Sequence, residues 1–313
     1  MIAWTDANNM PELPEVETVA RGLQRAVVGR KILSVTLGKT DFIDDPETVE
    51  KQLPGRKILA VERYGKFLLL RLSGNEGAGQ GNEGVALLVH LGMTGMLLPQ
   101  AVKEPQRKHT HVVLQLDDGQ ELRYVDPRRF GRIAYLAGEV LSGELRRFGA
   151  DPLEVGLEEF ARRIRARRAR VKALLLDQHV LRGVGNIYAD ESLWKAKIHP
   201  AQLGTRLKTH QVEQLYGVLQ DILQKAIALR GSSISDFLDA EGLPGEYQRH
   251  HRVYGREGKS CVRCKTPIRR VIVAGRSSYY CPNCQRAPRG WKKKGKAKTE
   301  ASRRTGASKT RKS

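Results

Sequence analysis

The sequence predicts an α+β protein in which an N-terminal β-sandwich domain with a flanking helix precedes a helical domain and a small cysteine hairpin. Seven short apolar runs separated by turn residues occupy residues 32–136, which favours a sandwich of short strands. After about residue 144, apolar residues recur with the 3.6-residue period of helices. Four cysteines then gather between residues 261 and 284.

The sandwich region begins with a helix predicted over residues 15–28, which Gly29 can end. One face of this helix carries its apolar side chains, Val16, Val19, Ala20, Leu23 and Val27. Strands are predicted over residues 32–37, 57–64, 67–72, 85–91, 111–116, 121–125 and 132–136. The stretch SGNEGAGQGNEG, residues 73–84, has almost nothing to bury, so we expect a mobile loop there.

The helical region contains predicted helices over residues 158–176 and 206–229, the second of which Gly231 can end. Between them lies the stretch LRGVGNIYADESL, residues 181–193, with two glycines in its first half. We interpret it as a helix–two-turn–helix. Its glycine-containing turns would leave backbone N–H groups exposed at the start of the second helix, where they could bind a phosphate. An ordinary turn between two helices is the alternative.

The cysteines follow the pattern C-x2-C-x16-C-x2-C, which is typical of a zinc site. They are Cys261, Cys264, Cys281 and Cys284. Four thiolates would close a tetrahedral shell around one structural Zn²⁺ and leave no open position for catalysis. Two disulfides are the alternative, but nothing else in the sequence indicates an oxidising compartment. Residues 268–280, IRRVIVAGRSSYY, are predicted to form a β-hairpin that turns at Ala274-Gly275.

The chain is strongly basic, with 55 Lys and Arg against 34 Asp and Glu among 313 residues and a net charge of +21. Residues 287–313 hold seven Lys, four Arg and one Glu with almost no apolar residues, so a basic disordered tail is predicted there. The remaining body is also basic, which favours a polyanionic partner over a merely solvated surface. No long apolar run and no secretory signal is apparent, so we expect no membrane segment.

Two turn motifs carry side chains suited to inserting into a base stack. In YVDPRRFGRI, residues 124–133, Asp-Pro forms a turn with Arg128 and Phe130 at its tip. Phe130 is either tucked beneath the turn or, in this basic protein, a wedge that unstacks bases. HLGMTG, residues 90–95, places Met93 in a similar turn, where a second wedge competes with an ordinary core methionine.

The stretch MPELPEVETV begins at Met10 and looks like a chain start. If Met10 is the initiator and is removed, Pro11 becomes an N-terminal secondary amine with a reference pKa of about 7.7–8.0, low enough to act as a nucleophile near neutral pH. Glu12 is then placed to act as a general acid, and Lys66, in RYGKFLLL, as a second cation. A plain helix start with Pro14 in its first turn is the alternative, which leaves Pro11 unexplained.

The chain resembles bacterial formamidopyrimidine-DNA glycosylase from Met10 to about Arg286. The resemblance rests on motifs in the family's order: PELPEVET, GKFLLL, HLGMTG, KHTHV, YVDPRRFG, GVGNIYADESL, IHP, VYGREGKSC and the four-cysteine module. It implies a β-sandwich domain joined to a helix–two-turn–helix domain and a zinc finger, with duplex DNA in the cleft between them. It also implies a bifunctional DNA glycosylase and abasic-site lyase of base excision repair, which removes oxidised purines such as 8-oxoguanine and formamidopyrimidines.

The resemblance implies catalytic roles for four residues. Pro11 would form a Schiff base with the sugar of the damaged nucleotide, and Glu12 would assist the opening of the sugar ring. Lys66 would then serve as the proton donor of β-elimination, and Arg276, on the cysteine hairpin, as that of δ-elimination.

The resemblance also implies residues that hold the DNA. Met93, Arg128 and Phe130 would fill the space that the flipped nucleotide leaves. The positions that match DNA contacts are His109, Arg128, Arg167, Lys172 and Asn186, of which Arg167 stands where we expect a lysine in the family.

Residues 1–9 form an extension that we expect to be absent from the mature protein, because a peptide-bonded proline nitrogen cannot form an iminium ion. The remaining chain divides into a catalytic domain (10–140), a helical domain (144–245), a zinc finger (251–286) and the tail (287–313). We expect a monomer that acts on damaged double-stranded DNA at the nucleoid in the bacterial cytoplasm.

Two alternatives stay open. One is an endonuclease VIII-type glycosylase for oxidised pyrimidines, against which Leu13 argues because that branch typically reads Pro-Glu-Gly-Pro-Glu. The other is a DNA-binding zinc protein without catalysis.

Overall fold

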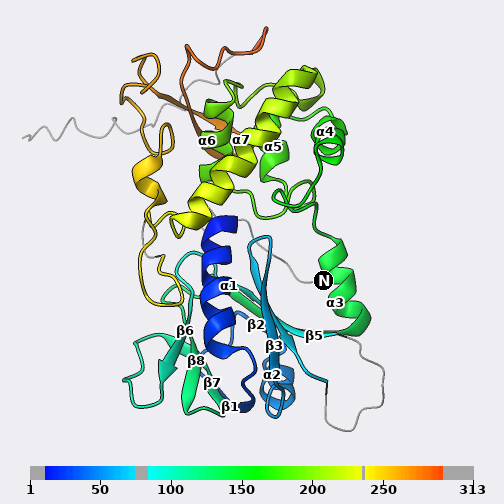
Figure 1. Cartoon of the computed structure of the whole chain (residues 1–313), viewed down its shortest axis with the longest axis vertical. Coiled ribbons are helices and arrows are strands. Elements are labelled where there is room, and N and C mark those ends of the chain that lie inside the picture. The colour runs from blue at the N-terminus through cyan, green and yellow to red at the C-terminus, as the bar shows by residue number, and fades with distance from the viewer. Residues whose placement is uncertain (1–10, 75–83, 235–236, 292–313) are drawn as a thin grey trace, which may run out of the picture.

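The computed structural model describes residues 11–74, 84–234 and 237–291. Figure 1 shows a sheet-rich half and a helical half, with helix α1 (Leu13–Val27) standing at the joint between them. The extension 1–9, most of the predicted loop 73–84 and the tail beyond Trp291 lie outside the described residues. Within the described residues, no helix has the length and apolar character that crossing a membrane requires.

Two sheets form the lower half, which confirms the predicted sandwich. The first contains, in spatial order, β1 (Ile32–Leu37), β7 (Thr110–Leu116), β8 (Gln120–Val125) and β6 (Met96–Ala101). The second contains β2 (Ile43–Asp44), β9 (Arg132–Ala137), β5 (Val85–His90), β4 (Phe67–Leu72) and β3 (Ile58–Tyr64). All neighbours pair antiparallel except β2 and β9, which run parallel.

Three elements of this half go beyond those predicted, namely β2, β6 and the short helix α2 (Pro46–Gln52). β6 contains Pro99, which interrupts a strand pattern in the sequence. Proline is tolerated there because β6 is an edge strand, where an N–H can be missing without breaking the ladder.

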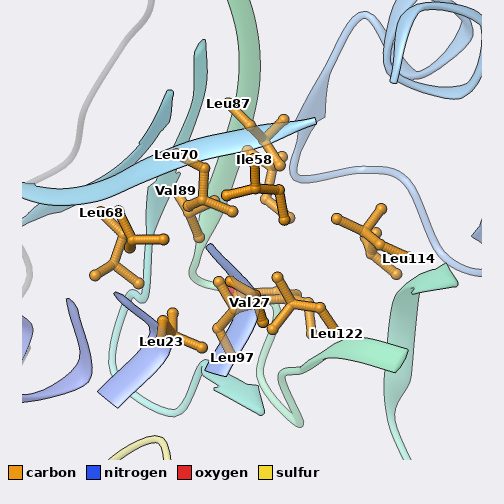
Figure 2. Close-up of a cluster of buried hydrophobic side chains, with 14 of the residues drawn as sticks. Leu23, Val27, Ile58, Leu68, Leu70, Leu87, Val89, Leu97, Leu114 and Leu122 are labelled. Carbon is orange, nitrogen blue, oxygen red and sulfur yellow. The ribbon is translucent and has the colours of Figure 1, made fainter. Parts of the chain in front are cut away.

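The core of the lower half lies between the two sheets and the apolar face of α1. Figure 2 shows Leu23 and Val27 of α1 gathered with side chains from both sheets. Leu68 and Leu70 come from β4 and Leu122 comes from β8, and all three are fully buried. Because burial of each such side chain contributes about 1.5–3 kcal/mol, the sheets and α1 are held as one body.

Helix α1 begins at a capping box. The backbone N–H of Glu12 donates to Glu15 Oε2 at 2.9 Å, and the Glu12 side chain accepts in return from the backbone of Glu15. Pro14 lies in the first turn, where its missing N–H leaves no bond unmade. Gly29, with φ of 86°, follows the end of the helix, as predicted.

The upper half packs α4 (Leu157–Arg165), α5 (Val171–Leu176), α6 (Asn186–Lys195) and α7 (Thr209–Ala228) around a second apolar core. Helix α3 (Gly138–Arg146), which was not predicted, leads into it. The turns between α5 and α6 confirm the predicted helix–two-turn–helix. Leu13, the first residue of α1, is fully buried in this second core, so α1 joins both halves.

The single helix predicted over residues 158–176 is wrong, because the chain leaves the helical path between α4 and α5. There the backbone N–H of Val171 donates to Gln202 O at 2.7 Å, and Gly204 N donates to Ala169 O at 2.9 Å. These bonds to a distant segment replace helical bonds. Similarly, the helix predicted over 206–229 begins only at Thr209, after a short 3₁₀ turn.

A segment that follows α7, residues 237–243, returns to the sandwich and lies along α1; we call it the return segment. Phe237 and Ala240 belong to the core cluster of the lower half. A Cβ placed on Gly22 of α1 would stand 2.6 Å from Ala240 Cβ, so the contact requires glycine. Arg25 and Glu241 form an ion pair at 2.9 Å beside it. The two halves are therefore joined at a second place.

The cysteine hairpin contains β10 (Arg269–Val273) and β11 (Arg276–Tyr280), joined by Ala274-Gly275 as predicted. Both turn residues have positive φ, 52° and 74°, the geometry of a two-residue hairpin turn. Trp291, in the stretch predicted to be disordered, packs edge-on against His199 with ring centroids 4.7 Å apart. The ordered chain thus extends at least five residues past the predicted boundary at 286.

Candidate active site

Three segments from both halves of the molecule meet at the start of α1. Leu13 N–H donates to Gly183 O at 3.0 Å. An added Cβ on Gly183 (φ 93°) would stand 2.9 Å from Leu13 Cβ, and one on Gly65 would stand 3.2 Å from Gly183 N. The first residues of the described chain, the β3–β4 turn and the turns before α6 therefore approach one another at backbone distance, which two glycines allow.

Glu12 lies on the N-terminus of α6. Its Oε1 accepts from Ile187 N at 2.9 Å and its Oε2 from Tyr188 N at 3.4 Å. The first turn of α6 thus holds this carboxyl group, whereas a phosphate at the glycine turns that precede it stays a prediction. A Cβ on Gly185 would stand 2.3 Å from Glu12 Cδ, so only glycine leaves room for the carboxyl group there.

The carboxyl group of Glu12 is 4 % exposed, and this burial raises its pKa to about 7, against the lowering effect of the nearby Lys66 charge. Burial disfavours the charged carboxylate because the surroundings replace little of the lost hydration. Near neutral pH a substantial fraction of Glu12 therefore carries a proton that it can donate. We call Glu12, Lys66 and residues 185–188 the acid site.

Lys66 lies in the β3–β4 turn and is itself 9 % exposed. Its charge acts on Glu12 and also on His90, whose pKa falls to about 3, mainly through burial. His90 is therefore neutral, and its Nδ1 accepts from Gly92 N at 3.1 Å. Lys66 is the cation that the acid site places beside Glu12.

Pro11 directly precedes Glu12 and is buried with it. The predicted nucleophile and the predicted acid are therefore neighbours in the same interior position between the two halves. The residue before Pro11 lies outside the described part of the chain.

Glu15 is a further buried carboxyl group at this site, which the sequence shows only as an acid in the first turn of α1. Its carboxyl group accepts from Glu12 N at 2.9 Å, from Tyr188 OH at 2.5 Å and from Ser232 N at 2.6 Å. It is 2 % exposed. Glu15 thus ties the start of α1 to α6 and to the chain that follows α7, and no local pattern in the sequence could have indicated those partners.

Arg276 begins β11 on the cysteine hairpin and is half-buried. Burial lowers the pKa of Lys172; Asp190 and Glu12 act to raise it, and Arg276 acts to lower it further. Glu12 and Arg276, two of the predicted catalytic residues, therefore both lie within electrostatic range of Lys172. The structure therefore brings all four predicted catalytic residues to the region where the two halves join.

Met93 and the pair Arg128 and Phe130 lie on two neighbouring loops, residues 90–95 and 126–131, which we call the wedge loops. The guanidinium carbon of Arg128 stands 4.5 Å from the Phe130 ring centroid, and Phe130 is 46 % exposed. Met93 is half-buried. Phe130 is thus not tucked beneath its turn, and the geometry favours the wedge interpretation for it.

Asp126 is fully buried and joins the two wedge loops through hydrogen bonds. Its Oδ1 accepts from Thr94 Oγ1 at 2.6 Å and from Arg128 N at 3.2 Å. Its Oδ2 accepts from Gly131 N at 2.9 Å and from Tyr124 OH at 3.2 Å. Four donors therefore fix the backbone from which the exposed side chains project.

The predicted DNA contacts divide by exposure. His109 and Arg167 are exposed, and Arg167 pairs with Asp177. Asn186 is the first residue of α6, and its Oδ1 has no hydrogen-bond partner within the described residues. Lys172, in contrast, is 0 % exposed and forms an ion pair with Asp190, so this conformation offers DNA no ammonium group there. Its predicted DNA contact stays a prediction.

The four cysteine sulfurs lie within 4.8 Å of one another, as a zinc shell requires. Cys264 Sγ stands 3.3 Å from Cys281 Sγ and 3.5 Å from Cys284 Sγ. A tetrahedral Zn²⁺ with Zn–S bonds of about 2.3 Å separates its sulfurs by about 3.8 Å, so the cluster fits the ion. A disulfide needs about 2.05 Å, so the sulfurs are unbonded thiols and the zinc prediction is confirmed.

Comparison with known proteins matches three parts of the chain to one architecture. Residues 10–133 match the formamidopyrimidine-DNA glycosylase N-terminal domain, residues 148–238 the formamidopyrimidine-DNA glycosylase H2TH domain, and residues 258–287 a zinc finger found in FPG and IleRS.

Whole-chain relatives agree. The formamidopyrimidine-DNA glycosylase of Solibacter usitatus is 46 % identical over 279 residues, and that of Herpetosiphon aurantiacus is 43 % identical over 281; each alignment covers 88 % of this chain and 100 % of the relative. Among solved structures, the Lactococcus lactis Fpg in complex with DNA containing an abasic site has a TM-score of 0.78 at 35 % identity, covering 88 % of this chain and 100 % of that one. The MutM (Fpg) protein of Thermus thermophilus has a TM-score of 0.75 at 38 % identity, covering 88 % of this chain and 98 % of that one.

Proposed function

The chain belongs to the formamidopyrimidine-DNA glycosylase family, and on that premise we propose how its residues divide the work of base release and strand cleavage. The protein is a DNA glycosylase and abasic-site lyase of base excision repair that removes oxidised purines from duplex DNA. Its partner is damaged double-stranded DNA, and one chain supplies every residue of the site, as a monomer requires.

Base release begins at Pro11. Its nitrogen forms a bond to C1′ of the damaged nucleotide while Glu12 donates its proton to O4′ and the C1′–O4′ bond breaks, which opens the sugar. The proline nitrogen then gives its proton to the base, and the glycosidic bond breaks with its electron pair going to the base, which leaves an iminium ion between Pro11 and the opened sugar. The carboxyl group suits this role because its pKa of about 7 keeps a proton available near neutral pH.

Two eliminations then cut the strand. The iminium ion acidifies the C2′ proton, and its loss expels the 3′ phosphate; Lys66, beside Glu12, serves this step. A second elimination expels the 5′ phosphate, for which we assign Arg276 on the hairpin. Met93, Arg128 and Phe130 fill the duplex where the damaged nucleotide leaves, and His109, Arg167 and Asn186 contact the backbone.

The observation that carries this assignment is the buried carboxyl group of Glu12, held by the amides of α6 next to Pro11 and Lys66. A protein that only binds DNA has no use for a protonated acid in its interior. The preference for purines over pyrimidines is supported by Leu13 and by the relatives' names. Competition between duplexes with 8-oxoguanine and with thymine glycol tests it, and a clear preference for thymine glycol would contradict it.

The role of Pro11 requires a free amine, so the working chain must start there. The match to the family's N-terminal domain, which begins at residue 10, supports this start. The domain boundaries at 140–144, 245–251 and 286–287 are likewise proposals, and two separate apolar cores support the first of them. A chromosomal substrate supports a location at the nucleoid in the bacterial cytoplasm.

Borohydride trapping tests the nucleophile. Protein produced from Met10 should form a covalent adduct with damaged DNA, whereas protein shown by mass spectrometry to retain residues 1–9 should form none. An adduct on the intact longer chain would rule out Pro11 and point to a lysine, with Lys66 the first candidate.

A further inference from the structure

Lys172 of α5 and Asp190 of α6 form a fully buried ion pair. Lys172 Nζ stands 2.6 Å from Asp190 Oδ1, and the side chains are 0 % and 1 % exposed. Removing two charges from water costs more than their attraction returns unless further hydrogen bonds complete the pair. A fully buried ion pair is therefore weak evidence for a gain in folding stability, and its function depends on the groups that its remaining hydrogen bonds bind.

Those hydrogen bonds go to the backbone of β11. Lys172 Nζ donates to Ser277 O at 2.8 Å, and Tyr279 N donates to Asp190 Oδ2 at 2.8 Å. The two partners come one and three residues after Arg276 along the same strand. The pair thus binds β11 at two points immediately beside the arginine.

The hairpin geometry explains why these two groups are available. Arg276 pairs with Val273 across the two-residue turn, and the next pairs alternate between bonded and unbonded. Ser277 and Tyr279 occupy the unbonded positions, so their N–H and C=O groups point away from β10. The ion pair therefore completes the outer edge of a hairpin that has two strands.

Helix α6 connects this edge to the acid site. Its first turn donates Ile187 N–H to Glu12, and Asp190 follows three residues later, a rise of about 4.5 Å along the helix axis. The same helix thus binds Glu12 through Ile187 and binds β11, the strand of Arg276, through Asp190 one turn later.

We propose that Lys172 and Asp190 are positioning residues: as a buried ion pair on α5 and α6, they hold the backbone of β11 and so set where Arg276 stands relative to Glu12. The proposal rests on the proposed function, in which Arg276 serves the second elimination. It assigns Lys172 to the geometry of the hairpin and not to a phosphate.

The test replaces both charges together, Lys172→Met with Asp190→Leu, because a single change would leave the other charge buried alone and endanger folding. The matched control is Lys195→Met with Asp221→Leu, which removes an ion pair between α6 and α7 whose side chains are 44 % and 66 % exposed. The product ends of a preformed abasic-site duplex are measured under single turnover, with zinc content determined for each protein.

The double variant should yield about tenfold less product of the second elimination relative to the first, as expected when a group is displaced from its reacting position. Its zinc content should match that of the control, and its base release should fall less than its second elimination. An unchanged product ratio in the zinc-loaded variant would overturn the proposal, and so would an equal loss of base release and second elimination.

Arg276→Ala, measured in parallel, separates this proposal from the role of Arg276. If Arg276→Ala still carries out the second elimination, the assigned role of Arg276 is wrong. The effect of the Lys172–Asp190 pair on β11 is then measured by hydrogen exchange at the Tyr279 amide. Exchange about tenfold faster in the double variant then supports the hold on β11, and unchanged exchange overturns it.

Discussion

Glu12, the proposed acid, and Phe130, a proposed wedge, lie in different environments: Glu12 is 4 % exposed and Phe130 is 46 % exposed. In the acid site, the functional side chain itself is held, by amides from the other half of the molecule. In the wedge loops, the carboxylate of Asp126 holds the backbone, and the side chains of Arg128 and Phe130 are exposed.

The difference follows from what each region must do. A carboxyl group that donates a proton near neutral pH needs the raised pKa that burial provides. A side chain that enters a base stack must be exposed to solvent in the DNA-free protein, and the backbone that carries it must be rigid. The comparison predicts that changes in the acid site cost chemistry, whereas changes at the tips of the wedge loops cost lesion engagement alone.

The largest effect is expected for Glu12→Gln, which keeps the shape and the acceptor oxygen but removes the proton. Single-turnover base release should fall by about 10²–10⁴-fold, the usual contribution of a general acid. Binding to a lesion duplex, measured by fluorescence anisotropy, should change little. Base release at the parent rate would show that Glu12 is not the acid.

Gly185→Ala should come next, because its Cβ would displace the Glu12 carboxyl group from which it stands 2.3 Å. A displacement of this size costs about 10²-fold in rate. Gly217→Ala in α7, where no atom lies within 4 Å, is the matched control and should keep full activity. If both variants release base equally fast, the close contact has no catalytic consequence.

The pH profile of base release should be bell-shaped. Protonated Glu12 is lost as the pH rises through about 7, so the rate should fall about tenfold per unit well above that value. Below about 7.7–8.0 the Pro11 amine becomes protonated, which produces the opposite limb. Glu12→Gln should abolish the high-pH limb in its residual activity, and persistence of that limb would assign it to another group.

Asp126→Asn should loosen both wedge loops, since an amide NH₂ would face donors where the carboxylate now accepts four bonds. We expect a loss of about 1–3 kcal/mol in the free energy of unfolding, measured in urea. The exposed Asp221→Asn is the control. Cleavage of a preformed abasic site should persist in the folded fraction, and its loss would show that the loops also support the acid site.

Phe130→Ala should have the smallest effect. Because the side chain is 46 % exposed, the free energy of unfolding should stay within about 0.5 kcal/mol of the parent. Flipping of the damaged nucleotide, followed with a fluorescent base analogue, should slow, while the trapped adduct on an abasic site should form as before. A large loss of stability would place Phe130 in the core and remove the contrast with Glu12.

The two regions also differ in what the sequence predicted. The Asp-Pro turn with exposed Arg128 and Phe130, the Ala274-Gly275 hairpin and the zinc ligands depend on local chemistry, and the structure has each where the pattern placed it. The glycine turns before α6 were correctly predicted as a set of bare amides. That the amides just after them hold the carboxyl group of Glu12 could not be predicted, because Glu12 lies some 175 positions away in the chain.

Long-range contacts explain the remaining differences. Glu15 resembled any acid in a first helical turn, and Lys172 was predicted to contact DNA, whereas the observed partners of both come from other segments of the chain. The break between α4 and α5 arises from bonds to residues 202–204, which helical periodicity cannot indicate. Motifs therefore predicted the candidate functional residues, whereas only the tertiary structure shows how they are held.

The return segment has a consequence for how the chain is made. Phe237 and Ala240 complete the core of the sandwich, and the Arg25–Glu241 pair beside them joins residues 216 positions apart. During synthesis, the N-terminal half therefore emerges from the ribosome before its core is complete. The apolar contacts of Phe237 and Ala240 form only after α7 has been synthesised. Such late, non-local contacts slow folding and make the two halves one cooperative unit, although each has a core of its own.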